Sequence, residues 1–377
     1  MTRFAFLSTY PPTRCGLATF TEALSGAMLE RDPAVPRVVR VTDEPSAPSA
    51  RRFGARPVAA ELVNGDRSSI AASIRTLNGF DIVIVQHEYG IFGGVDGDEV
   101  IAVLEGLTTP SIVVLHTVLD APTPGQKAVL ERVAQLATSV VVMSDAAHQI
   151  LSERYDVAMF KVQVIPHGVP APLGERQLEH PVAGRVLTWG LIGPGKGLEW
   201  GIRAMAQLKD LVPTPEYLIV GRTHPKVLLN EGEAYRASLK RVVVELGVEH
   251  MVTFVDEYLN DEELAAFVSS AAVVLLPYDT SNQVTSGVLA EAIAAGKPVV
   301  STRFPHSVEL LTAGAGVLVA HESPDEIAAA LRDVLGEVGL AARMSSAASR
   351  VAAGTTWPDV AARYRALAEG ILAVRAA

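Results

Sequence analysis

The stretch Val186-Leu-Thr-Trp-Gly-Leu-Ile-Gly-Pro-Gly-Lys-Gly197 joins a short apolar run to a glycine-rich loop that contains a lysine. The apolar run predicts a buried strand, and a helical pattern follows the loop. Strand, glycine-rich turn and helix in this order are typical of a parallel sheet with crossover helices. The stretch therefore predicts an α/β domain, with backbone N–H groups free to hold an anion where the helix begins.

The same alternation of Val/Ile-rich runs and helical patterns continues on both sides of this stretch. Strands are expected at Phe4–Leu7, Val38–Val41, Ile82–Gln86, Ile112–Leu115, Ser139–Met143, Val162–Ile165, Val186–Trp189, Tyr217–Val220, Val252–Val255, Val273–Leu276, Val299–Ser301 and Val317–Val319. Apolar residues at helical spacing predict a first helix around Phe20, Leu24 and Met28. The expected class is α/β throughout.

The length of 377 residues exceeds what one hydrophobic core usually supports, so two domains are expected. Residues 1–170 form the first and residues 185–356 the second. The linker is placed at 171–184, because the chain there is rich in Pro, Gly and charge and lacks apolar periodicity. Residues 357–377 read as an amphipathic helix that can pack back on the N-terminal domain.

Composition excludes several functions. The formal net charge of −10 argues against nucleic-acid binding, which needs a basic patch. No apolar run approaches the ~18 residues that suggest a membrane span, and the start lacks a signal-peptide pattern. The single Cys15 can form no internal disulfide. A cytoplasmic protein is expected, and peripheral membrane contact remains open.

Two loops carry candidate anion contacts. The loop from Ser8 to Leu17 follows a strand and precedes a helix; Gly16 would allow close backbone approach, and Arg14 is a candidate phosphate or acceptor-side contact. An ordinary turn with a solvated arginine is the alternative. In the second loop, Lys196 would add a mobile charge suited to a diphosphate, although an exposed loop lysine fits as well. The first loop is not GxGxxG, and the second is not a Walker A loop, because its spacing is wrong and no Ser or Thr follows Lys196.

A third group of residues lies between Tyr278 and Val300. Ser286 and Gly287 are expected to begin a helix with free N–H groups, and Glu291 follows about one turn later. A carboxylate in that place can accept both hydroxyls of a ribose. A surface glutamate would be the default reading, but the small apolar neighbours of Glu291 favour a partly buried position.

These stretches together resemble the retaining glycosyltransferases that include sucrose and glycogen synthesis enzymes and bacterial mannosyltransferases. The resemblance rests on Val164-Ile-Pro-His-Gly168, Gly190–Gly197, Leu275-Leu-Pro-Tyr278 and Ser286–Val300 with Gly296-Lys-Pro-Val-Val, and it matches the N-terminal half more loosely. It implies the GT-B fold, in which two Rossmann-like domains face each other across a cleft. It also implies transfer of a hexose, mannose or glucose, from a nucleotide diphosphate sugar with retention of configuration.

The resemblance also implies roles for single residues. Lys196 would contact the donor diphosphate, the Ser286 and Gly287 amides its phosphates, and Glu291 the ribose. His116, at a strand end, would lie near the transferred sugar, although a buried structural histidine is a serious alternative. His87, at another strand end, could shape the acceptor side, and Glu88 beside it is the candidate if a base is needed.

This sequence departs from the family pattern at two positions. Leu191 stands where the family usually has an arginine, so one diphosphate cation is missing; Arg222 could supply it from a neighbouring loop or could be a surface residue. Gln283 replaces the first of two glutamates eight positions apart. This substitution leaves sugar recognition open, although an amide can still bind hydroxyls.

No metal or cofactor is expected. Asp96-Gly-Asp98 fits the Asp-x-Asp pattern of metal-dependent glycosyltransferases, but such a pair in a glycine-rich loop arises easily by chance. Positive side chains and helix N-termini can stabilise the leaving diphosphate instead. The partners are then a nucleotide sugar, GDP-mannose or UDP-glucose, and a small-molecule or glycan acceptor that the sequence does not identify.

Other functions remain open on the same architecture. A nucleotide-sugar epimerase or a sugar phosphorylase would share the two-domain fold, and a non-catalytic nucleotide-sugar-binding protein would explain Leu191 and Gln283. A nicotinamide dehydrogenase is disfavoured, because neither half contains GxGxxG followed by an acidic residue about 20 positions later.

Overall fold

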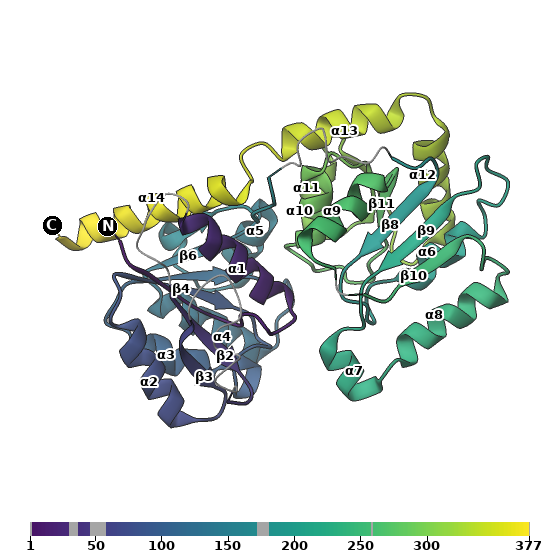
Figure 1. The fold of residues 1–377 in the computed structure, drawn as a ribbon. Coiled ribbons are helices and arrows are strands. Elements are labelled where there is room, and N and C mark those ends of the chain that lie inside the picture. Colours follow the sequence, from purple (N-terminus) through teal and green to yellow (C-terminus); the bar gives the residue numbers. More distant parts are fainter. Residues whose placement is uncertain (1, 30–36, 46–57, 172–180, 258, 377) are drawn as a thin grey trace. The chain divides into compact units, whose positions relative to one another are not determined.

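A computed structural model describes residues 2–29, 37–45, 58–171, 181–257 and 259–376. The chain divides into two compact units, one of residues 1–168 with 354–377 and the other of residues 169–353. Each unit contains one parallel β-sheet and its helices (Figure 1). Most of the linker expected at 171–184 lies outside the described residues, and so does the last residue of the expected C-terminal helix.

The first unit contains a seven-stranded parallel sheet in the order β3-β2-β1-β4-β5-β6-β7. Its strands are β1 Phe4–Ser8, β2 Arg37–Thr42, β3 Val58–Val63, β4 Ile82–His87, β5 Ser111–Leu115, β6 Ser139–Val142 and β7 Val162–Val164. Its helices are α1 Gly16–Leu29, α2 Arg67–Leu77, α3 Glu99–Gly106, α4 Pro124–Leu136, α5 Asp145–Arg154 and α14 Trp357–Ala376, with short 3-10 turns at η2 Val95–Gly97 and η3 Met159–Lys161.

The last helix, α14, belongs to the first unit although it lies at the other end of the chain. It packs against α1, and Figure 1 shows the two helices next to each other. Its buried face carries Val360 and Tyr364, which join the core formed with Phe6, Phe20 and Ile84. Apolar residues at helical spacing thus complete the cover of this face of the sheet.

Every strand expected from the sequence is present, with ends that agree to within one residue. The expectation missed β3, which forms the edge of the first sheet beside β2. Ala59, Ala60 and Glu61 occupy the middle of this strand, and its residues are mostly only half-buried. An edge strand without β-branched residues at its centre has too weak a pattern to be recognised.

The second unit contains a six-stranded parallel sheet in the order β10-β9-β8-β11-β12-β13. Its strands are β8 Arg185–Trp189, β9 Glu216–Val220, β10 Val252–Val255, β11 Val273–Leu276, β12 Val299–Thr302 and β13 Gly316–Val319. Its helices are α6 Leu198–Met205, α7 Pro225–Glu231, α8 Ala234–Glu245, α9 Asp261–Ser270, α10 Gly287–Ala294, α11 Pro305–Leu311, α12 Pro324–Gly336 and α13 Leu340–Val351.

The strand order reverses direction at one point in each sheet. In the first unit the reversal falls between β1 and β4, and in the second between β8 and β11. In open parallel sheets, ligands bind outside the carboxyl ends of the strands at this point. The loops after β1, β4, β8 and β11 are therefore the places where each unit can hold a ligand.

The helices formed by the described residues include none that is long and apolar enough to cross a membrane.

Candidate functional site

The loop after β8 is held close to the loop after β11 by its glycines. Gly190, Gly195 and Gly197 have φ values of 120°, 86° and 59°. Residues that carry a side chain rarely adopt such backbone angles. A Cβ on Gly197 would lie 1.9 Å from the carbonyl oxygen of Pro277. The Asp279 N–H also donates to the Gly195 carbonyl at 3.0 Å. The two loops at the switch point thus form one tightly packed structure.

Lys196 lies in this structure. Its side chain is half-buried, and its Nζ lies 4.1 Å from the centre of the Tyr278 ring, near the start of the loop after β11. Tyr278 is buried and stacks on Phe304 at 5.5 Å between ring centres. The predicted diphosphate cation is therefore at the switch point, with its ammonium over an aromatic face.

The loop after β9 pairs with the loop after β8. The Ile192 N–H donates to the carbonyl of Arg222 at 2.8 Å, and the His224 N–H donates to that of Ile192 at 2.8 Å. A Cβ on Gly221, whose φ is 136°, would lie 1.9 Å from the carbonyl oxygen of Gly190. Arg222 itself is exposed on this loop, whereas Leu191 is half-buried. The Arg222 backbone is thus fixed beside the glycine-rich loop. A contact of its side chain with the diphosphate stays a prediction.

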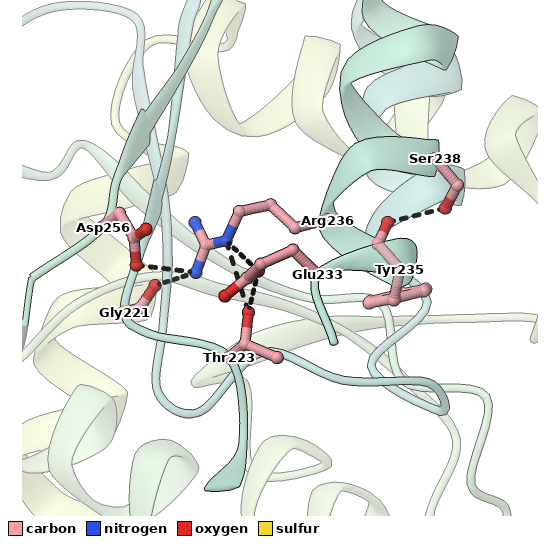
Figure 2. A network of polar contacts seen from close by, with 7 residues as sticks. All are labelled: Gly221, Thr223, Glu233, Tyr235, Arg236, Ser238 and Asp256. Carbon is pink, nitrogen blue, oxygen red and sulfur yellow. Dashed lines mark hydrogen bonds and ion pairs between the residues drawn. The ribbon is translucent and has the colours of Figure 1, made fainter. Parts of the chain in front are cut away.

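Arg236, in the first turn of α8, supports the loop after β9 (Figure 2). Its Nη2 donates to the Gly221 carbonyl at 2.7 Å and lies 3.1 Å from a carboxylate oxygen of Asp256. Its Nε lies 3.3 Å from Glu233, which also accepts a bond of 2.6 Å from the Thr223 hydroxyl. Only 4% of the Arg236 side chain is exposed, so the two carboxylates offset the cost of burying its charge.

The helix α10 begins where the sequence predicted, with Ser286 as its N-cap. The Ser286 hydroxyl accepts from the Leu289 N–H at 3.2 Å, which is ordinary capping geometry. The Ser286 N–H, however, donates to Nδ1 of the buried His306 at 2.9 Å. The expectation that both the Ser286 and Gly287 amides bind phosphate therefore needs correction, because the Ser286 N–H already has a partner. The phosphate contact of the Gly287 amide stays a prediction.

Glu291 is half-buried on α10, as its small apolar neighbours predicted. The indole N–H of Trp189, at the end of β8, donates to one of its carboxylate oxygens at 3.3 Å. This contact places the Glu291 carboxylate at the last residue of β8, after which the glycine-rich loop begins. The ribose contact expected of Glu291 stays a prediction.

Gln283 is half-buried in the loop that precedes α10. Its side-chain N–H group donates to the carbonyl of Thr285 at 3.0 Å, within its own loop. Its backbone carbonyl lies 3.4 Å from the His306 N–H. The contacts hold this loop against α11, and the predicted sugar contact of Gln283 would use the side-chain oxygen.

In the first unit, His116 and Gln86 meet at the ends of β5 and β4. Nε2 of His116 lies 2.7 Å from the Gln86 side-chain oxygen, so this nitrogen donates when the amide has that orientation. The His116 and Phe20 rings also pack edge to face, with 4.8 Å between their centres and an angle of 84° between their planes. Burial, with the nearby His167 and His87, lowers the pKa of His116 to about 3. The imidazole is therefore neutral at pH 7 and can serve as a hydrogen-bonding group.

His87 and Glu88 follow one another at the end of β4 and differ in environment. His87 is fully buried, its ring nitrogens have no partner among the described residues, and burial lowers its pKa to about 4. Glu88 is half-buried and accepts a bond from the Thr117 hydroxyl. A fully buried ring is badly placed for the acceptor contact predicted for His87, whereas the role of Glu88 stays a prediction.

The loop after β1 contains Gly16 and Arg14, the two residues predicted to contact a ligand in the first unit. Gly16 is the first residue of α1, and a Cβ there would meet no described protein atom within 4 Å. No neighbour in the protein therefore requires glycine at this position. Arg14 is exposed in the same loop. Both remain predicted ligand contacts.

The Asp96-Gly-Asp98 loop has local roles. Asp96 adopts a left-handed conformation with a φ of 54°, and the Asp98 carboxylate accepts from the Val95 N–H at 3.2 Å. Among the described residues, no group of three or more His, Cys, Asp or Glu side chains is arranged to hold a metal ion. Asp98 thus stabilises its own turn.

Several residues of these sites carry no signal in the sequence. Arg236 reaches Gly221, which is 15 residues away, and His306 reaches Ser286, which is 20 residues away. Gln86 and Trp189 stand at strand ends, and that position is the one clue by which they could have been found. Their partners, His116 and Glu291, are 30 and 102 residues away in the chain.

Comparison with known proteins shows what the second unit resembles. Residues 183–337 match the family described as Glycosyl transferases group 1. Anabaena HepE, whose crystal structure contains UDP and glucose, superposes with a TM-score of 0.78 over 98% of this chain and 100% of that chain, at 16% identity. The likeness shows that the chain has the GT-B fold expected from the sequence. Residues 183–337 therefore carry a domain of the group 1 glycosyl transferase type.

Two relatives extend the comparison. The D-inositol 3-phosphate glycosyltransferase of Kineococcus radiotolerans is 30% identical over 266 residues, which are 63% of this chain and 58% of the relative. The GDP-mannose-dependent alpha-(1-6)-phosphatidylinositol monomannoside mannosyltransferase of Mycolicibacterium smegmatis is 32% identical over 160 residues, or 41% of this chain and 39% of that protein. The matched region thus spans little more than half of the first relative.

Proposed function

We propose that the chain is a hexosyltransferase that moves mannose or glucose from a nucleotide diphosphate sugar to an acceptor, with retention of configuration and without a metal. The observation that carries the proposal is the arrangement at the β8/β11 switch point. Lys196, the start of α10 at Gly287 and the carboxylate of Glu291 offer a cation, a helix N-terminus and a hydroxyl acceptor there. These are the groups that a nucleotide diphosphate needs.

Charge stabilisation is the chemical contribution we assign to this unit. Lys196 and the N-terminus of α10 at Gly287 would neutralise charge that develops on the leaving diphosphate. A phosphate oxygen of the leaving group can take the proton of the acceptor hydroxyl as the new glycosidic bond forms on the same face. The neutral His116 would then hydrogen-bond to the transferred sugar, and Glu88 would be the group able to assist the acceptor hydroxyl.

The proposed donor is GDP-mannose, with UDP-glucose as the alternative. The name of the Mycolicibacterium relative specifies GDP-mannose, and the HepE crystals contain UDP and glucose. Both nucleotides present the same ribose and diphosphate to Lys196 and Glu291. We also place the protein in the cytoplasm, where the free thiol of Cys15 would stay reduced.

A thermal-shift screen across nucleotide sugars, followed by transfer assays with candidate acceptors, tests the proposal. A donor that binds the native state should raise the melting temperature in proportion to its affinity. The anomeric configuration of the product, read by NMR, reports retention. Binding without turnover on any acceptor would favour the non-catalytic binding protein, and conversion of the donor without an acceptor would favour an epimerase.

The site itself is tested by Lys196→Ala, matched with Lys240→Ala on the exposed face of α8. Both variants remove one positive charge, so long-range electrostatics change alike. Loss of a charged hydrogen bond costs about 1.5–3 kcal/mol, so Lys196→Ala should bind nucleoside diphosphate roughly 10- to 100-fold more weakly. Equal affinity in the two variants would remove Lys196 from the site.

A further inference from the structure

Tyr278 supplies an aromatic face to Lys196 in the loop after β11. The Lys196 Nζ lies 4.1 Å from the ring centre, and the ring is only 1% exposed. Among the described residues, no carboxylate forms an ion pair with Lys196. The face of the ring is therefore the group that orders the ammonium in this structure.

The Tyr278 ring and backbone are held in place by three neighbouring residues. Phe304 stacks on it with an angle of 18° between the ring planes. The Tyr278 backbone carbonyl accepts bonds from the Thr302 hydroxyl at 2.7 Å and from Nδ1 of His321 at 2.8 Å. Thr302 of β12 and His321 after β13 thus fix the Tyr278 backbone, and Phe304 after β12 fixes the ring.

The Tyr278 hydroxyl, unlike the ring and the backbone carbonyl, makes no hydrogen bond within the described part of the chain that holds the residue in place. It is buried and has no hydrogen-bond partner among the described residues. A buried hydroxyl without a partner costs stability, so a hydrogen bond of the hydroxyl does not explain why an aromatic residue occupies position 278. What Tyr278 offers its surroundings is the electron-rich face of its ring.

We propose that Tyr278 is a positioning residue, which holds the ammonium of Lys196 over its ring so that this cation is ordered before a nucleoside diphosphate binds. The proposal rests on the function proposed above and adds a requirement for an aromatic ring at position 278. An ammonium group has three N–H donors, so contact with the ring leaves donors for phosphate oxygens. Ordering the flexible lysine in advance reduces the entropy lost on binding.

Fluorinated phenylalanines at position 278 provide the sharpest test, because fluorine withdraws electron density from the ring face while the shape hardly changes. Tyr278→Phe is the baseline, since the hydroxyl has no partner. Nucleoside diphosphate affinity, measured by calorimetry with GDP and with UDP, should equal wild type in Tyr278→Phe. It should then fall with each added fluorine, by about three- to tenfold at the highest substitution, which corresponds to the strength of a partly buried cation–π contact. A flat series would overturn the proposal.

The same series in a Lys196→Ala background separates this inference from the proposed function. Without the ammonium, added fluorine should no longer change the affinity, because the ring has lost its partner. A fluorine effect that persists in Lys196→Ala would show that the ring acts on the ligand directly and would overturn the inference. If Lys196→Ala itself binds nucleoside diphosphate like wild type, the proposed donor site fails instead.

A non-aromatic variant gives a second readout. Tyr278→Leu should weaken nucleoside diphosphate binding at least as much as the most fluorinated ring does, and its melting temperature reports any loss of packing against Phe304. Unchanged affinity in a folded Tyr278→Leu protein would contradict the proposal. A structural role alone would lower the melting temperature in Tyr278→Leu while leaving the fluorinated series without effect.

Discussion

The indole N–H of Trp189 donates to the carboxylate of Glu291 at 3.3 Å, across 102 positions of sequence. This bond joins the end of β8 to the middle of α10 and presents the carboxylate beside the glycine-rich loop. We predict that Glu291→Ala weakens the intact donor and the free nucleoside diphosphate alike, because both carry the ribose diol. Loss of a charged hydrogen bond costs about 1.5–3 kcal/mol, and calorimetric titration measures it.

Trp189→Phe is the matched variant, since it keeps an aromatic ring and removes the N–H donor. It should reduce nucleoside diphosphate affinity less than Glu291→Ala, because the carboxylate remains but loses its orientation. If Glu291→Ala affected the intact donor and spared the free nucleotide, the ribose would have to be bound elsewhere.

Gln283 should recognise the transferred sugar. Gln283→Ala is expected to spare the free nucleoside diphosphate while it lowers transfer and changes the discrimination among donor sugars. Gln283→Glu should lose the bond to the Thr285 carbonyl, because a carboxylate has no N–H to donate. It should keep the fold and shift donor preference. If Gln283→Ala lost as much affinity for the free nucleoside diphosphate as for the intact donor, Gln283 would not bind the transferred sugar.

Transfer should survive exhaustive chelation with EDTA. Asp98 already accepts a bond within its own turn, and the proposed charge stabilisation uses Lys196 and α10. Asp96→Asn combined with Asp98→Asn should therefore retain the wild-type rate in a transfer assay, apart from local effects on the turn. Activity lost in EDTA and restored by manganese or magnesium would falsify the metal-free mechanism.

His87 should make folding stability depend on pH. Above pH 6.5 the imidazole is neutral in both the folded and the unfolded protein. As the pH falls from 6.5 towards the folded pKa of about 4, only the unfolded state gains the proton, so the free energy of unfolding falls. His87→Phe removes this effect. Between pH 7 and pH 5 the variant should lose about 2 kcal/mol less stability than the wild type, measured by urea unfolding.

The control for this measurement is His250→Gln, which removes an exposed histidine in the second unit and leaves the buried position intact. It should follow the pH dependence of the wild type. A His87→Phe protein that loses as much stability as wild type between pH 7 and pH 5 would mean that His87 is protonated in the folded state.

Local patterns in the sequence determined much of the fold. Short Val/Ile-rich runs predicted the strands around Phe6, Ile84 and Val274, because a strand buried on both faces must be apolar along its length. The glycines at 190 and 197 marked a tight turn before a helix, and Ser286 marked a helix start. The edge strand at Val58–Val63 was not predicted, because its residues are less buried and show little periodic pattern.

Tertiary structure alone decided which side chains meet. The positions of Lys196 over Tyr278, Glu291 beside Trp189, and Arg236 under Gly221 depend on the order of strands in the sheet and on the lengths of the loops between them. The Ser286 N–H became unavailable because α11 brings His306 to it. Periodicity and capping act within a few residues of the chain, so they specify elements. Contacts between elements arise when the sheet aligns strands that are distant in sequence, and no local pattern contains that information.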